Sequence, residues 1–157
     1  MEKSHRDFMQ EAIRLSKESV QAGGGPFGAV IVKDNEIIAK SSNSVTKDND
    51  PTAHAEVNAI RKAAANLQNF DLSGCVIYTS CEPCPMCLGA IYWARLDKLY
   101  YGNTKADAGH IGFDDSFIYE EIDLPKDNRK LPHIQIMRNE ALEAFKLWEQ
   151  TEEKTEY

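Results

Sequence analysis

Mostly apolar residues near the start of the chain recur at helical spacing, at Phe8, Met9, Ala12, Ile13, Leu15 and Ser16. The glycines at positions 23–25 interrupt this pattern, so the first predicted helix ends before them. Two apolar runs, residues 29–32 and 36–39, follow and are joined around Asp34-Asn35. Two short apolar runs on either side of such a turn predict a β-hairpin.

The next elements alternate between helix and strand. Asp50-Pro51-Thr52 is a helix start signal, and it predicts a second helix from Ala53 to Ala65 with Thr52 or Asp50 as its cap. Further elements are predicted in order along the chain: a buried strand at 75–79, a helix to about Arg95, a strand at 98–101, a weak strand from Ile134 to Met137, and a helix from Asn139 to about Glu149.

This order of elements predicts an α/β fold. A strand, a helix and a strand in succession imply a right-handed parallel crossover beside the hairpin. The expected sheet is therefore mixed and five-stranded, with helices on both faces. Residues Gly102 to Ser116 hold three glycines and two adjacent aspartates. We expect them to form a loop beyond a strand's carboxyl end, where ligands bind in open α/β sheets.

Composition adds limits to this fold. With 157 residues, 42% hydrophobic and 27% charged, the chain is expected to form a single domain over residues 1–157. The N-terminus lacks an apolar leader region and no stretch has the length of a membrane span, so we expect a cytoplasmic protein without a membrane partner. The net charge of −7 and the lack of a Lys/Arg cluster favour a small, free substrate over a nucleic acid.

Three of the four cysteines are crowded together, at Cys81, Cys84 and Cys87. This crowding fits metal binding in a reducing compartment better than a set of disulfides. Cys75 and Cys81 are expected to be buried apolar residues in or after a strand.

Two short motifs supply the ligands of one zinc site, His54-Ala55-Glu56 and Pro83-Cys84-Pro85-Met86-Cys87. One imidazole and two thiolates fill three corners of a tetrahedral zinc site, leave the fourth for water, and have a carboxylate nearby as proton acceptor. A structural zinc ribbon would need a second C-x-x-C or an H-x3-H, and a redox pair has no use for the upstream His and Glu. The remaining alternative is a pair of buried, reduced cysteines near a helix start.

Local geometry supports the zinc interpretation. Pro85 suits the first position of a helix, so Cys84 is expected at its N-cap and Cys87 one turn along on the same side. The positive end of the helix favours the thiolate form that zinc requires. We expect His54 and Glu56 in the first turn of the second helix. Residues two apart diverge on a helix, so this pair should flank a substrate rather than touch.

H-x-E followed by P-C-x-x-C is the known signature of zinc deaminases. Residues from about Ala22 to Tyr119 resemble the cytidine and nucleobase deaminase superfamily. Two runs within this region, residues 79–95 and 112–117, resemble the bacterial small-form guanine deaminase family. The resemblance implies a three-layer α/β/α fold, hydrolysis of guanine to xanthine and ammonia, and a homodimer that exchanges C-terminal segments, about residues 139–157.

The resemblance also implies residue roles. His54, Cys84 and Cys87 would bind one zinc per chain, and Glu56 would shuttle protons. Asp115 would take part in proton transfer, and the implied substrate contacts are Phe27, Asn43, Ala55, Trp93, Asp115 and Tyr157, with Tyr157 closing the site. Several of these have a plain alternative: Phe27 and Trp93 as core residues, Asn43 and Asp115 as turn residues, and the acidic tail as a solvated end.

Three other functions fit the same core. Adenosine deamination in transfer RNA uses the same zinc motif, but the acidic charge and the Phe-Asp-Asp-Ser segment at 113–116 count against it. The zinc motif alone does not separate guanine from cytosine deamination. A non-catalytic, zinc-stabilised binding module would not require Glu56.

Overall fold

The computed structural model describes residues 1–157 and divides them into two compact units, Met1–Ser116 and Phe117–Tyr157. The first unit contains a four-stranded sheet in the order β2-β1-β3-β4. Its strands are β1 (Gly28–Lys33), β2 (Glu36–Ser42), β3 (Cys75–Cys81) and β4 (Lys98–Asn103). β1 pairs antiparallel with β2 and with β3, whereas β3 and β4 are parallel. The predicted hairpin, parallel crossover and mixed sheet are confirmed.

The predicted fifth strand, Ile134 to Met137, is wrong. No strand forms there, and the sheet has four strands. The alternation that suggested a strand is real, but Ile134 and Ile136 are 82% and 75% exposed. An extended segment becomes a strand only when another strand satisfies its backbone groups, and the second unit contains no strand to pair with it.

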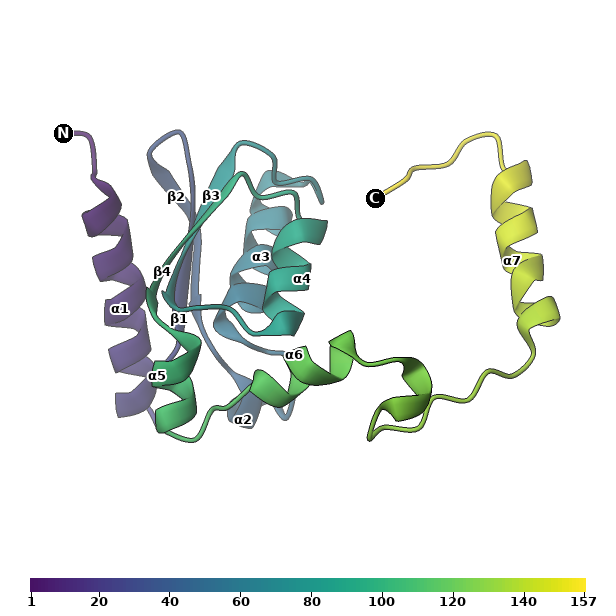
Figure 1. Ribbon diagram of the computed structural model, residues 1–157. Coiled ribbons are helices and arrows are strands. Elements are labelled where there is room, and N and C mark those ends of the chain that lie inside the picture. Colours follow the sequence, from purple (N-terminus) through teal and green to yellow (C-terminus); the bar gives the residue numbers. More distant parts are fainter. The chain divides into compact units, whose positions relative to one another are not determined.

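Helices cover both faces of the sheet (Figure 1). Helix α1 (His5–Gln21) lies on one face, and α3 (Ala55–Leu67) and α4 (Pro85–Trp93) lie on the other. Because side chains of a strand alternate between faces, β3 contributes to both cores. Cys75 and Ile77 pack in the cluster that contains α3 and α4, whereas Val76 and Tyr78 pack in the cluster of α1.

The start of α3 differs from the sequence prediction. His54 itself is the N-cap, with extended backbone and no side-chain capping bond, so it precedes the first turn instead of lying in it. Asp50 caps nothing in α3, because its carboxylate accepts hydrogen bonds from the backbone N–H and the hydroxyl of Thr52. The N-cap position leaves the His54 imidazole available for another partner.

The β1–β2 hairpin turns through Asp34 and Asn35, which both adopt positive φ angles, 49° and 64°. Two successive left-handed residues form the type I′ turn that matches the twist of a hairpin. Asn and Asp tolerate this conformation better than other non-glycine residues.

The segment from Gly102 to Ser116 was expected to be a loop, but part of it is helical. It contains the short helix α5 (Lys105–His110), which begins with a capping box between Thr104 and Asp107. The glycines at 109 and 112 obscured this start signal, because glycine disfavours helix. A further short helix, α2 (Val45–Asp48), follows β2.

The second unit consists of α6 (Ser116–Asp123), the 3-10 turn η1 (Lys126–Asn128) and α7 (Arg138–Gln150). Helix α6 is closed at its C-terminal end by the Arg129 guanidinium, which donates to the carbonyls of Glu121, Ile122 and Leu124. These are the carbonyls that a helix end leaves without partners. The predicted helix from Asn139 is confirmed within one residue at each end. No helix in the chain has the length and apolar character needed to cross a membrane.

Gly28 tests the packing of α1 on the sheet. A Cβ at this position would lie 2.3 Å from the carbonyl oxygen of Ala12, a backbone atom that cannot move aside. We expect Gly28→Ala to lower the free energy of unfolding by about 1–3 kcal/mol, measured by denaturant unfolding. Gly89→Ala in α4 is the matched control, because a Cβ there meets nothing within 4 Å. It should be neutral or stabilising by about 0.5–1 kcal/mol. Equal effects of the two changes would contradict this packing.

Candidate metal centre and active site

The strand directions bring the candidate residues to one edge of the sheet. β1 runs opposite to β2 and β3, and β4 runs with β3, so the carboxyl ends of β2, β3 and β4 meet the amino end of β1. The chain segments at these strand ends carry the candidate residues Phe27, Asn43, His54, Glu56 and Cys84. Ligands bind at such edges in open α/β sheets because loops and helix N-termini converge there.

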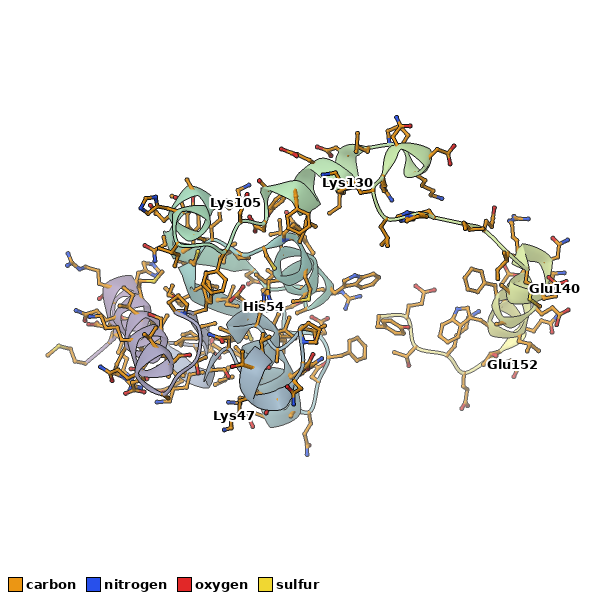
Figure 2. All side chains as sticks on the ribbon, turned by 90° about the horizontal axis from the view of Figure 1, so that it is seen from below. Lys47, His54, Lys105, Lys130, Glu140 and Glu152 are labelled. Atoms are coloured by element: carbon orange, nitrogen blue, oxygen red, sulfur yellow. The ribbon has the colours of Figure 1, made fainter.

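His54, Cys84 and Cys87 form the candidate metal centre. Their ligand atoms all lie within 4.8 Å of one another, and both sulfurs are 3.5 Å from His54 Nδ1. Cys84 is the N-cap of α4, Pro85 is its first residue, and Cys87 follows one turn later, as predicted. Figure 2 shows His54 among the elements of the first unit, where α3 begins.

The spacing of the three ligand atoms fits zinc. Zn–N bonds of about 2.0–2.1 Å and Zn–S bonds of about 2.3 Å at a tetrahedral angle separate N from S by about 3.5 Å. This is the separation of His54 Nδ1 from both cysteine sulfurs. Three protein ligands leave one tetrahedral position open, which distinguishes catalytic zinc sites from closed structural ones.

The electrostatics of this cluster favour the thiolate at Cys84. Hydrogen bonds from the Cys87 thiol and the His54 ring lower the pKa of Cys84 to about 4. The same arrangement raises the pKa of Cys87, whose thiol donates to Cys84, and the pKa of His54, which also bonds to Cys84. The Cys84 sulfur, which accepts hydrogen bonds from two donors, is suited to bind a metal cation, because the cation takes the place of the donated protons.

Glu56 is the carboxylate beside this cluster. It lies in the first turn of α3 and is only 7% exposed. Burial raises the pKa of Glu56, and the Cys87 thiol partly offsets this by hydrogen bonding to the carboxylate. A buried carboxylate with a raised pKa is a stronger proton acceptor near neutral pH.

Ala55, between the two motif residues, is fully buried as the first residue of α3. Its backbone N–H belongs to the first turn, where helices leave donors without intrahelical acceptors. This N–H is suited to bind an oxygen of a ligand at the metal centre.

Asn43 and Phe27 form a connected wall at the same edge of the sheet as the metal centre. The Asn43 amide accepts a hydrogen bond from Gly25 N–H (3.2 Å) and donates to the Gly25 carbonyl (2.7 Å). The backbone N–H of Asn43 donates to the Phe27 carbonyl at 3.3 Å. Phe27 meets Phe113 edge to face, with ring centroids 5.0 Å apart. The alternative interpretation of Asn43 as a turn residue is therefore correct in part, because its side chain holds the glycine turn in place.

The two adjacent aspartates have different environments. Asp114 accepts a hydrogen bond from the Ser116 backbone N–H and so forms the local turn at the start of α6. Asp115 is half-buried, and burial raises its pKa. The negative charge of Cys84 raises the pKa of Asp115 further.

The remaining candidates lie elsewhere. Trp93 is 69% exposed at the last residue of α4. It therefore lies at the opposite end of that helix from Cys84, and the structure does not bring it to the metal centre of its own chain. Tyr157 belongs to the second unit, and its role stays a prediction. Cys75 and Cys81 are buried in β3, as predicted, and the Cys81 thiol faces the Thr104 carbonyl at 3.8 Å.

Sequence reasoning did not identify two residues of this edge, Phe113 and Asn58. Phe113 packs on Phe27. Asn58 lies four residues after His54, on the same face of α3, and donates to oxygens on both sides of Asn43. Its position one turn beyond a metal ligand is the signal that points to it. The expected ligand-binding segment also lines a cavity of about 320 Å³ through Asn103, Asp107 and His110, bordered by Phe27.

The chain belongs to the cytidine and deoxycytidylate deaminase zinc-binding family, which matches residues 2–103. It is similar to the guanine deaminase of Bacillus subtilis (strain 168), with 55% identity over 155 residues, 98% of this chain and 99% of that protein. The X-ray structure of B. subtilis guanine deaminase matches with a TM-score of 0.96 and 54% identity over 99% of each chain. A tRNA-specific adenosine deaminase of Aquifex aeolicus is 42% identical over 105 residues, 67% of this chain and 68% of that protein.

These similarities confirm the predicted cytidine-deaminase-like α/β fold, with four strands in place of five. They also confirm zinc as the metal of the family, and the cluster of His54, Cys84 and Cys87 has the ligands to hold it.

The metal centre predicts which cysteines matter. His54→Ala, Cys84→Ser and Cys87→Ser should each lose most of the zinc, because each removes one of only three protein ligands. Elemental analysis of the purified variants measures this against about one zinc per wild-type chain. Cys75→Ala and Cys81→Ala are the matched controls and should retain zinc. A Cys81 variant that loses zinc while the Cys84 variant keeps it would overturn the assignment.

Proposed function

We propose that this protein is a zinc-dependent deaminase that hydrolyses guanine to xanthine and ammonia. The similarity to guanine deaminase carries this proposal, because it spans 98% of the chain at 55% identity. The local chemistry supports it, since a buried carboxylate, Glu56, and a half-buried one, Asp115, accompany the metal ligands.

The reaction adds water at guanine C2 and expels the amino group. C2 lies between two ring nitrogens, so addition there gives a tetrahedral carbon from which ammonia can leave. When bound by His54, Cys84 and Cys87, zinc lowers the pKa of a coordinated water to about 7. Glu56 takes the proton of the attacking water and delivers it to the ring nitrogen, a contribution on the order of 100 to 10,000-fold. Asp115 assists the second proton transfer, to the departing amine.

The remaining residues of the edge orient the base. The Ala55 N–H donates to an oxygen of the substrate, and Asn43 and Phe27 contact the purine ring. An ionised Asp115 accepts hydrogen bonds from purine N–H groups, which suits guanine with its ring N–H and exocyclic amine.

Adenosine deamination in transfer RNA is the nearest alternative activity. The relatives with this activity are less similar: one is 42% identical over 67% of this chain and another is 45% identical over 65% of it. The net charge of −7 also disfavours an RNA backbone. Cytosine deamination shares the zinc chemistry, and a zinc-stabilised binding module would have no need for the buried Glu56.

A substrate comparison tests the proposal. Purified protein should release ammonia from guanine faster than from adenine, cytosine or their nucleosides, and zinc content is measured on the same samples. A chelator should abolish the release and added zinc should restore it. If the zinc-loaded protein ignores guanine and deaminates cytosine or a transfer RNA anticodon loop, the proposed substrate is wrong.

Glu56→Gln and Asp115→Ala test the proton carriers. Glu56→Gln should retain zinc and the fold but lose about 100-fold or more in kcat, because an amide cannot accept the proton of water. Asp115→Ala should reduce guanine turnover without loss of zinc. Asp114→Ala is its matched control and should keep turnover, because the Asp114 carboxylate accepts its hydrogen bond from the Ser116 N–H of the local turn. Substantial ammonia release by zinc-loaded Glu56→Gln would remove Glu56 from the mechanism.

We further propose that the chain acts as one deaminase domain in a homodimer whose C-terminal segments, about residues 139–157, are exchanged, with Tyr157 closing a substrate site. Apolar side chains of α7 support this, since Phe145 and Leu147 are 70% and 67% exposed and need cover. Tyr92 and Trp93 at the end of α4 are also exposed and are suited to a subunit contact. The disulfide-free cysteines of the metal centre suit a reducing compartment, so we place this step of purine catabolism in the cytoplasm.

Deletion of residues 153–157 should impair guanine turnover and leave zinc bound, because an open site admits bulk water. Co-refolding a tail-deleted chain with an Asp115→Ala chain decides whether the C-terminal segment closes the partner's site or the site of its own chain. With exchange, one site of the heterodimer carries both defects and the other is intact, so activity returns. No recovery in a verified heterodimer, or full activity of the deletion alone, would contradict the exchanged tail.

A further inference from the structure

Helix α3 is tied along the edge strand β2 by polar side chains. Strand β2 has a neighbour on one side only, so its outward carbonyls need other donors. Every fourth residue of α3 supplies one: Asn58 donates to Ser42 O at 3.1 Å, Lys62 to Lys40 O at 3.4 Å, and Asn66 to Ile38 O at 2.7 Å. Four helical residues rise about 6 Å and two strand residues about 6.7 Å, so the two spacings match.

The bond made by Asn58 differs from the other two, because it reaches the site. Its side-chain nitrogen lies 3.1 Å from Ser42 O, 3.0 Å from Ser44 Oγ and 3.4 Å from Ala53 O. Two of these oxygens belong to the residues on either side of Asn43, and the third belongs to the residue before His54. The Asn58 amide, beside the backbone hydrogen bond from Ser44 N–H to Ala53 O (2.9 Å), thus joins the Asn43 segment to the approach to a metal ligand.

This connection continues into the substrate wall. Asn43 binds Gly25 through its amide and the Phe27 carbonyl through its backbone N–H. Phe27 in turn packs on Phe113, two residues before Asp115. Displacement of the Asn43 segment from α3 would therefore move the surface that contacts the base while leaving His54, Cys84 and Cys87 where they are.

We propose that Asn58 is a positioning residue that fixes the Asn43–Phe27 wall of the substrate site at a set distance from the metal centre. This inference rests on the guanine deaminase function proposed above. Asn58 does not touch the substrate; it acts through Asn43 and Phe27. Its loss therefore weakens base binding more than it slows the chemical step.

The test compares Asn58→Leu with Asn66→Leu in the full-length, zinc-loaded protein. Both changes keep the approximate side-chain size and remove one amide that ties α3 to β2. Only the first removes a bond beside the site, since Ile38 lies toward the other end of the strand. We expect Asn58→Leu to raise the KM for guanine about tenfold, with kcat changed less than about threefold and zinc retained. Hydrogen exchange of residues 42–54 should become faster in Asn58→Leu only.

Asn66→Leu should leave KM and the exchange of residues 42–54 near wild type, although it lowers stability. If both variants lower only the unfolding temperature, or if Asn58→Leu loses zinc, Asn58 is not a positioning residue of the substrate wall. Asn58→Ser, a smaller change, replaces Asn58→Leu if the latter does not fold. A wild-type protein without guanine turnover would refute the proposed function. The hydrogen exchange of residues 42–54, together with the KM for whichever base is deaminated, would then still decide the role of Asn58.

Discussion

The meeting of two helix N-termini is the constraint on which the active site depends. His54 and Cys84 are the N-cap residues of α3 and α4, and both lack a side-chain capping bond within their own helices. An N-cap residue has extended backbone, so its side chain is free to leave the helix axis. Because β2 and β3 run in the same direction, the two helices that follow them begin at the same edge of the sheet. The metal ligands thus come together through strand direction, and no long loop is required.

Charge explains why this edge tolerates a buried carboxylate and two thiols. Helix N-termini carry partial positive charge and favour anions. Glu56 would be costly to bury alone, and burial does raise its pKa. Bound zinc opposes that shift, because a divalent cation is the largest local charge in such a site. Loss of zinc would therefore also change the proton affinity of Glu56.

Much of this site could be predicted from the sequence because its motifs are local. The spacing of Cys84, Pro85 and Cys87 fixed the N-cap geometry of α4, and the structure agrees. The fifth strand was predicted wrongly. The apolar residues at 134–137 show a pattern compatible with a strand, but a sequence pattern does not show whether another strand is present to pair with it. Trp93 was expected at the pocket from resemblance; it ends α4, at the opposite end of the helix from Cys84, and its role stays a prediction. The spacing of Asn58 from His54 placed it on the same helix face, but its partners could not be predicted, because they become neighbours only when α3 lies along β2.

The division between shared chemistry and base selection follows the chain. The family match ends at residue 103, so it includes the metal ligands and Glu56, which any zinc deaminase of this type needs. Asp115 and Phe113 lie beyond that limit, and Phe113 packs on Phe27, which precedes the sheet. A pocket that recognises one base needs polar groups placed to match that base, since buried groups left unpaired are costly. We therefore expect a chimera, in which the segment after residue 103 is replaced by that of a relative, to prefer a different base. Its zinc site and proton chemistry should stay intact. Retention of guanine preference by a folded, zinc-loaded chimera would instead assign base selection to the wall that contains Asn43.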